Sequence, residues 1–229
     1  MKIPINHRLL ACCRFIRPGD RVADVGCDHG YLGIHLLLEG IASSVIASDL
    51  RRGPLNSAVA NAEKYGCSGA MTFYLSDGVR NIPRDFDTLV CAGMGAETII
   101  SILEAAPWLK SSRYRLILQC QTKTHLLRRY LSDQGWTAAR ESVQRDGKFL
   151  YTVMEVLWDP DAPRLTPGQC YVSPAMLAED TREVREHVLW IWQELHKLVT
   201  CRGEAATEHM QQALEELTPL ARSFREEEL

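Results

Sequence analysis

The chain has 229 residues and a mass of 25.8 kDa, and its 46% hydrophobic and 24% charged residues exclude a disordered or collagen-like protein. No stretch of about 18 apolar residues could span a bilayer, and the first residues carry no apolar signal segment, so we expect a cytoplasmic protein. The net charge of -3 is uneven, because residues 1–158 carry 19 Lys and Arg against 15 Asp and Glu, whereas residues 159–229 carry 7 against 14. A polyanion such as RNA would prefer the first part, although this excess alone is a weak signal.

The first 158 residues alternate between short apolar runs and segments with helical spacing, which is typical of an α/β protein with a mainly parallel sheet. We expect strands at 21–25, 44–48, 71–74, 88–92, 115–119, 137–141 and 151–158, and helices at 8–16, 31–39, 54–65 and 97–105. The last two strands flank a turn at Asp146-Gly147. The pattern therefore predicts a seven-stranded sheet, within a domain at 1–158, that closes in a hairpin.

Residues 159–170 contain prolines and a Pro-Gly pair that break both periodicities, so we expect a linker there. The following segment, 171–229, has apolar residues at helical spacing over 174–199 and 204–222. Two such helices predict an antiparallel, coiled-coil-like hairpin that is too small to form a core alone. It must pack on the sheet domain, on another chain or on a bound substrate, and the oligomeric state stays undetermined.

The eight cysteines lack any CxxC spacing, and no His, Cys, Asp or Glu cluster has metal-ligand spacing. We therefore expect buried cysteines that act as small apolar residues, and no metal.

A glycine-containing turn follows the first expected strand. Its sequence has the form D-x-G-x-x-x-G and comprises Asp24, Gly26, Cys27, Asp28, His29 and Gly30. The glycines let the backbone approach a ligand at the carboxyl edge of a parallel sheet, where such folds bind nucleotides. A dinucleotide-binding loop would need a third glycine, and the Asp28 carboxylate would repel a diphosphate. S-adenosylmethionine (SAM), which has no phosphate, is the better candidate, with NAD as the alternative.

The next three strand ends carry residues that such a cofactor needs. Asp49, followed by Leu50, ends the second strand, where an acid can accept hydrogen bonds from both ribose hydroxyls. After the third and fourth strands stand Ser76-Asp77-Gly78, placed to meet the adenine edge, and Ala92-Gly93-Met94-Gly95, where Met94 can cover the adenine. Each feature alone is a common cap or turn. Together they predict a SAM site at four consecutive strand ends.

These motifs resemble the bacterial tRNA (adenine-N1)-methyltransferases that act on adenosine 22, the TrmK family. The matching segments are 24–32, 47–49 with 53–55, 76–78, 92–95 and 118–121. The resemblance implies a class I, Rossmann-like methyltransferase fold with a C-terminal coiled-coil appendage, SAM as cofactor and tRNA as substrate. The chain departs from the family pattern at Gly33, Ala96 and Cys120. These departures leave two alternatives open: a methyltransferase of a small molecule or protein, or a SAM- or tRNA-binding protein without turnover.

Under this resemblance the catalytic candidates are Asp28 and Tyr31. Adenine N1 already carries its lone pair at neutral pH, so methyl transfer needs alignment and no general base. The methylated base is a cation, and the Asp28 carboxylate could stabilise it through the N6 amino group. Tyr31 could stack on the flipped base. The structural alternatives are a loop acid that binds backbone N–H groups and a tyrosine packed against the first helix.

Basic residues also flank the expected pocket. They are Arg8, Arg14, Arg51, Arg52, Lys123, Arg128 and Arg129. Such side chains would hold RNA phosphates without reading sequence. For any one of them the alternative is an ordinary solvated surface charge.

Overall fold

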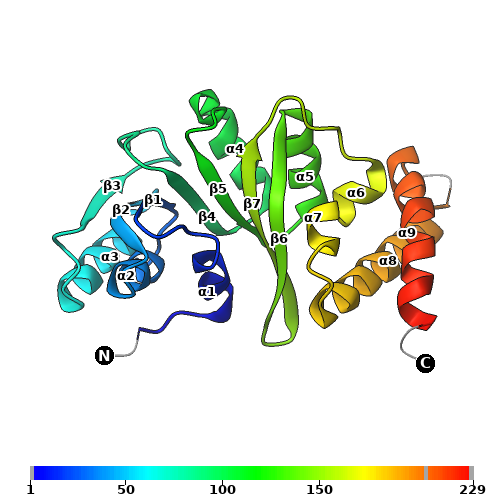
Figure 1. The fold of residues 1–229 in the computed structure, drawn as a ribbon, viewed down its shortest axis with the longest axis horizontal. Coiled ribbons are helices and arrows are strands. Elements are labelled where there is room, and N and C mark those ends of the chain that lie inside the picture. The colour runs from blue at the N-terminus through cyan, green and yellow to red at the C-terminus, as the bar shows by residue number, and fades with distance from the viewer. Residues whose placement is uncertain (1–2, 204–205, 227–229) are drawn as a thin grey trace.

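A seven-stranded sheet forms the centre of the computed structural model, which describes residues 3–203 and 206–226 (Figure 1). Its strands run in the order β3-β2-β1-β4-β5-β7-β6. All neighbours are parallel except β7, which is antiparallel to both β5 and β6. The strand bounds are β1 Asp20–Val25, β2 Ala42–Asp49, β3 Met71–Leu75, β4 Thr88–Met94, β5 Arg115–Cys120, β6 Trp136–Asp146 and β7 Phe149–Trp158. The α/β class, the seven strands and the closing hairpin are thus confirmed.

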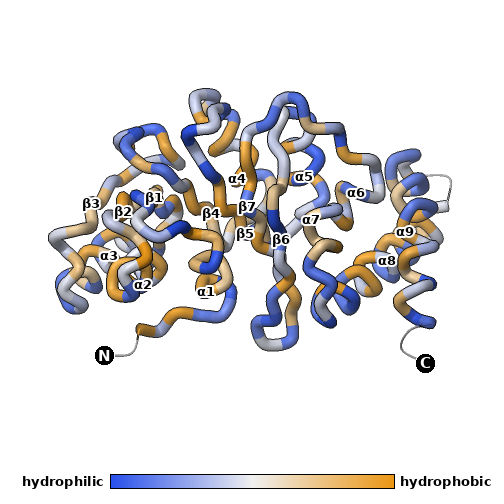
Figure 2. The backbone as a smooth tube through the Cα atoms, viewed as in Figure 1, coloured by the Kyte–Doolittle hydropathy of each residue, from blue (hydrophilic) through white to orange (hydrophobic). Residues whose placement is uncertain are grey.

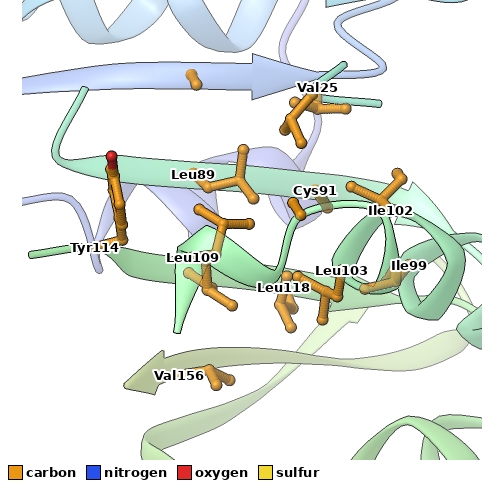
Figure 3. Packing of buried hydrophobic residues seen from close by; sticks show 14 of the residues in the cluster. Val25, Leu89, Cys91, Ile99, Ile102, Leu103, Leu109, Tyr114, Leu118 and Val156 are labelled. Atoms are coloured by element: carbon orange, nitrogen blue, oxygen red, sulfur yellow. The ribbon is translucent and has the colours of Figure 1, made fainter. Parts of the chain in front are cut away.

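Helices cover both faces of this sheet. On one face α1 (His7–Cys13), α2 (Tyr31–Leu38) and α3 (Arg52–Lys64) pack on inward-facing side chains of the central strands. On the other face α4 (Ala96–Glu104), the short 3-10 helix η1 (Pro107–Leu109) and α5 (Thr124–Asp133) bury a second apolar cluster, part of which Figure 3 shows. Because the central strands are covered on both sides, they contain consecutive apolar residues, such as Leu116-Ile117-Leu118 of β5, and all six residues of this strand are buried.

Two helices within the first 158 residues differ from the sequence prediction. The first begins at His7, capped by the Asn6 side chain, which accepts a hydrogen bond from the Leu9 N–H at 2.9 Å, and ends at Cys13 rather than at residue 16. The chain after Cys13 turns toward Pro18, which cannot continue a helix. Helix α5 was not predicted at all. Its apolar residues Leu127 and Leu131 face the sheet at helical spacing, so the pattern was present in the sequence.

The described part of the C-terminal region contains four helices: α6 (Pro167–Tyr171), α7 (Pro174–Leu177), α8 (Arg182–Arg202) and α9 (Glu208–Glu226). The predicted linker over 159–170 extends too far. Helix α6 already begins at Pro167, where Thr166 and Gln169 form a capping box. The expected helix at 174–199 is also divided. A turn containing Asp180, at a φ of +37°, separates α7 from α8, and Thr181 caps the second piece.

Helices α8 and α9 form the expected hairpin at one end of the molecule (Figure 1), where α8 packs on β6 of the sheet and α9 packs on α6 and α8. Hydrophobic and hydrophilic residues alternate along both helices (Figure 2), and their buried apolar side chains form a third core cluster with Val143 of β6 and Met176 of α7. The Trp192 indole N–H donates a hydrogen bond to the Thr218 hydroxyl at 3.0 Å and joins the two helices. The sequence left open whether the hairpin packs on the sheet domain, on another chain or on a substrate, and the structure shows that it packs on the sheet domain.

Seven of the eight cysteines are buried, as expected, and Cys201 is exposed. Within residues 3–203 and 206–226 there is no group of three or more His, Cys, Asp or Glu side chains that could hold a metal ion. None of the helices in this part of the chain is long and apolar enough to cross a membrane.

Candidate active site

A cavity of about 410 Å³ opens at the carboxyl ends of β1 to β4. This is the point where the strand order reverses between β1 and β4, and open α/β sheets bind ligands at such points. Seven of the residues predicted to bind the cofactor line it: Gly26, Asp49, Leu50, Ser76, Asp77, Gly78 and Met94. Four strand ends distant in sequence thus converge on one cavity.

The glycine turn after β1 is held against β2 by its backbone. The N–H groups of Gly26 and Cys27 both donate to the Ser48 carbonyl, at 2.8 and 2.9 Å. Gly26 has a φ of +74°, and a Cβ atom there would lie 2.3 Å from Cε of Met94. Gly26 therefore leaves the Met94 side chain room beside the turn, at the edge of the cavity.

We expect Gly26→Ala to weaken SAM binding roughly tenfold or more, because the new methyl group would displace Met94 from the cavity wall. The positive φ adds a folding cost of about 1–2 kcal/mol. Gly19→Ala is the matched control, since Gly19 has a φ of +85° and a Cβ there would meet no atom within 4 Å. Calorimetric titration with SAM should separate the two variants, and equal affinities would contradict the assigned role of Gly26.

Two buried carboxylates lie beside this turn. Asp49 ends β2, and its carboxylate accepts hydrogen bonds from the N–H groups of Arg51, at 2.8 Å, and Asp28, at 3.3 Å. Asp24 is 4% exposed, and its Oδ2 has no hydrogen-bond partner. Burial, with the nearby charge of Asp49, raises the pKa of the Asp24 carboxyl to about 7. This buried, unpaired oxygen is suited to a cationic or hydrogen-bond-donating ligand group.

The loop after β3 supplies another wall. The buried Ser76 hydroxyl accepts a hydrogen bond from the Asn81 N–H at 3.0 Å, and the Ser76 N–H donates to the Asp49 carbonyl at 3.0 Å. Asp77 is exposed and lies 3.4 Å from the Arg80 guanidinium. Ser76 thus fixes the loop, whereas the Asp77 carboxylate stays available at the rim of the cavity.

The end of β4 is tied to the end of β5. Gly93, at a φ of +79°, donates its N–H to the buried Gln119 side chain at 2.9 Å. The Gln121 N–H donates to the Met94 carbonyl at 2.8 Å, and the Ala96 N–H donates to the Thr122 carbonyl at 3.1 Å. These bonds hold the segment after β5 against the wall that carries Met94.

The predicted catalytic residues lie on the turn between β1 and α2. Asp28 adopts a φ of +50°, and its side chain is 63% exposed. The His29 Nε2 is 3.7 Å from the Asp28 carboxylate, and the rings of His29 and Tyr31 lie 5.8 Å apart. Tyr31 begins α2 and is half-buried. Asp28, His29 and Tyr31 therefore form one group on the turn, but they do not line the 410 Å³ cavity.

The remaining predicted cofactor residues act through the backbone or lie behind the cavity wall. Gly30, at a φ of +72°, precedes α2, and a Cβ there would lie 3.0 Å from Cβ of Ala58 on α3. Cys27 is buried, Ala92 lies within β4, and Gly95 precedes α4. These residues shape the turns and do not themselves line the cavity.

The structure corrects one of the predicted RNA-binding residues. Arg128 is 3% exposed, because it pairs with Glu141 of β6 and donates to the carbonyls of Cys170 and Tyr171 at 3.0 and 2.9 Å. It cannot hold a phosphate from there. Its guanidinium instead joins α5, β6 and α6.

The other predicted basic residues are at least partly accessible. Arg51, Arg52, Arg14, Lys123 and Arg129 are exposed, although Lys123 pairs with Glu97 and Arg129 lies 3.9 Å from Asp133. Arg8 is half-buried, with its guanidinium 5.4 Å from the centre of the Tyr151 ring.

Sequence reasoning missed the part of the cavity formed by α4. This wall of the cavity is formed by the first turns of α4, through Glu97, Thr98, Ser101 and Ile102. Val25 of β1 also lines the cavity and was not predicted. The signal was available, because α4 starts directly after the Gly-Met-Gly segment and successive turns of a helix present residues three and four apart on one face.

The parallel sheet, the switch-point cavity and the glycine turn define a nucleotide-cofactor enzyme of the class I methyltransferase type. Residues 5–154 match a family model described as a methyltransferase domain. The chain is 31% identical over 163 residues to the tRNA (adenine(22)-N(1))-methyltransferase of Bacillus subtilis, which covers 70% of this chain and 68% of that protein. The protein belongs to this tRNA (adenine(22)-N(1))-methyltransferase family, TrmK.

Solved structures agree with this assignment over nearly the whole chain. The crystal structure of the B. subtilis m1A22 tRNA methyltransferase TrmK superposes with a TM-score of 0.80 at 27% identity, covering 98% of this chain and 99% of that one. A putative tRNA (m1A22) methyltransferase from Streptococcus pneumoniae, in complex with S-adenosyl-L-methionine, superposes with a TM-score of 0.82 at 26% identity, covering 95% and 99%. The similarity thus includes the C-terminal helices.

Proposed function

We propose that this protein transfers a methyl group from SAM to N1 of adenosine 22 in tRNA. The observation that carries the proposal is the convergence of four strand ends on one switch-point cavity, in a chain of the TrmK family. Curated and structural relatives are tRNA (adenine(22)-N(1))-methyltransferases, and one of them was solved with SAM bound. As a tRNA-modifying enzyme it would act in the cytoplasm.

The residues around the cavity fit SAM. The unpaired Asp24 Oδ2 and the buried Asp49 carboxylate suit the amino group of the methionyl end and the ribose hydroxyls. Ser76, Asp77 and Met94 line the cavity and would contact the adenine, and Gly26 leaves room beside Met94. When bound, SAM supplies an electrophilic methyl group on a sulfonium. The absence of a phosphate agrees with the carboxylates at this site, which would repel the diphosphate of NAD.

Few side chains are needed for the transfer itself. The protein must align adenine N1 with the methyl group and exclude water, and it must stabilise the positive charge that appears on the base. We assign the last role to Asp28, whose carboxylate would accept a hydrogen bond from the N6 amino group. Tyr31, beside His29 at the same turn, would offer its ring to the flipped base.

The accessible basic residues would hold the tRNA backbone. Arg8, Arg14, Arg51, Arg52, Lys123 and Arg129 are the candidates, because their guanidinium and ammonium groups bind phosphates without sequence preference. Arg128 is excluded from these candidates because it is buried.

Reverse transcription across tRNA incubated with protein and SAM tests the proposal, because a methyl group on N1 blocks Watson–Crick pairing and stops the polymerase. We expect a SAM-dependent stop at adenosine 22. Labelled methyl transfer into protein or small molecules, with none into tRNA, would favour the other substrate class. SAM binding without any transfer would favour a protein without turnover.

Asp49→Ala is expected to weaken SAM binding roughly ten- to hundredfold, since hydrogen bonds to a charged group contribute about 1.5–3 kcal/mol. The Arg51 and Asp28 N–H groups also lose their acceptor, so part of the effect comes from the loop. Asp49→Asn is the informative companion, because it keeps an acceptor oxygen for one of those two N–H groups and removes the charge. Unchanged calorimetric affinity in both variants would place β2 outside the cofactor site.

A further inference from the structure

A second and larger cavity, of about 770 Å³, lies between the sheet domain and the C-terminal helices. Its walls come from the segment 121–123, from α5 and β7, and from α6, α8 and α9. The volume lies within the range of pockets that bind small organic molecules. No part of the proposed cofactor site uses it.

Several flat rings line this cavity. The rings of His125 and Tyr171 are stacked, with centroids 4.5 Å apart and planes at 7°. The rings of His187 and Trp190 are also near-parallel, 5.8 Å apart at 14°, and Trp190 is 56% exposed. Burial, with the nearby charge of Arg128, lowers the pKa of both histidines to about 4, so at neutral pH they are uncharged planar groups.

One lining side chain has an unmet hydrogen-bonding group. His187 is 8% exposed, and its Nδ1 has no hydrogen-bond partner among the described residues. Buried polar atoms of folded proteins are nearly always paired, and a neutral imidazole nitrogen either donates or accepts. A ligand with hydrogen-bonding atoms at the edge of a flat ring would suit such a lining.

Two exposed cations stand at the edge of this cavity. Lys123 pairs with Glu97, and Arg129 lies 3.9 Å from Asp133, so a phosphate would compete with these two carboxylates, and Glu194 is the carboxylate among the lining residues. A nucleotide combines the two features required here, since its base stacks on aromatic rings and its phosphates bind cations.

The cavity adjoins the proposed site of methylation. The segment 121–123 forms one wall of the 770 Å³ cavity. Its backbone is hydrogen-bonded to Met94 and Ala96, which lie on the side of the proposed cofactor site. Tyr151 lines the cavity, and the Arg8 guanidinium lies over its ring. However, the two cavities share no residue among those described, and the Lys123–Glu97 ion pair has one partner in each. The ligand is therefore a neighbour of the methyl acceptor.

We propose that the cavity between α5 and helices α8 and α9 binds one unpaired nucleobase of the tRNA, next to the methylated adenosine, by stacking it on aromatic side chains that include Trp190. This inference rests on the proposed function. It gives the C-terminal helices a specific role, because Trp190 and His187 of α8 supply the wall that faces the sheet domain's His125.

Trp190→Leu tests the proposal, because leucine retains apolar bulk at a half-exposed position and removes the ring. We expect its KM for tRNA to rise roughly five- to 150-fold, the range for loss of one base stack, with the Kd for SAM within about twofold of wild type. Trp190→Phe should recover most of the loss. Phe149→Leu is the matched control, since Phe149 is 54% exposed at the β6–β7 hairpin and lines neither cavity, and both of its constants should stay unchanged.

A second measurement identifies the ligand group. We expect the wild-type protein to bind more weakly to tRNA that lacks the base directly 5′ or directly 3′ of the methylated adenosine. On that abasic tRNA, the Trp190→Leu variant should bind little more weakly than the wild-type protein does. A KM of Trp190→Leu within about twofold of wild type would overturn the inference. So would a result in which the loss from the substitution and the loss from the missing base multiply on both abasic tRNAs. Either result would leave the proposed function intact. Wild-type protein that methylates no tRNA would overturn both.

Discussion

Replacing Arg128 by methionine is expected to lower the free energy of unfolding by about 3–5 kcal/mol, the usual result of removing one partner from a buried ion pair. The change leaves the Glu141 carboxylate, itself fully buried, with the Ser173 hydroxyl as its remaining donor. It also leaves the Cys170 and Tyr171 carbonyls without the guanidinium that joins them to α5. Urea unfolding followed by circular dichroism measures the loss.

Two further variants make this prediction specific. Arg129→Met alters the neighbouring arginine, which lies exposed 3.9 Å from Asp133, and should cost less than about 0.5 kcal/mol. The double variant Arg128→Met/Glu141→Leu removes both charges and should be more stable than Arg128→Met alone. Equal stability of the Arg128→Met and Arg129→Met variants would contradict the structural role that we assign to Arg128.

The second large effect is expected at Asp28. Asp28→Asn keeps the size of the side chain, and asparagine tolerates the positive φ of +50° at this position, so the turn should persist. If Asp28 stabilises the developing adenine cation, the single-turnover rate at saturating SAM should fall roughly ten- to thousandfold, which corresponds to about 1.4–4 kcal/mol. The Kd for SAM should stay within a few fold, because the Asp28 side chain does not line the cofactor cavity.

Asp161→Asn, an exposed aspartate in the connection between β7 and α6, is the control and should leave the rate unchanged. A rate for Asp28→Asn within about threefold of wild type would show that Asp28 only shapes its turn. A parallel collapse of SAM affinity would instead place Asp28 among the cofactor ligands.

Local sequence patterns determined the architecture of this protein and the cavity that we propose for its cofactor. The alternation of strands and helices predicted the sheet, and seven residues chosen at strand ends line the observed cavity. The physical reason is that strand period, turn glycines and helix caps depend on residues a few positions apart. In a parallel sheet, the carboxyl ends of the strands then meet at one edge whatever the remaining contacts are. The parts of the cavity that were missed, Val25 of β1 and the first turns of α4, carried the same kind of local signal.

Tertiary structure alone decided the features that depend on distant partners. Arg128 looks like a surface cation in the sequence, and it is buried because Glu141, Cys170 and Tyr171 reach it from 13 to 43 positions away. The 770 Å³ cavity exists only because the C-terminal helices fold back beside the sheet and bring His187 and Trp190 into the same lining as His125. A charged side chain is stable in a protein interior only where counter-charges and acceptors meet it, and an aromatic cavity needs walls from several elements. Neither condition can be read from neighbouring residues, because both arise when the chain folds back on itself.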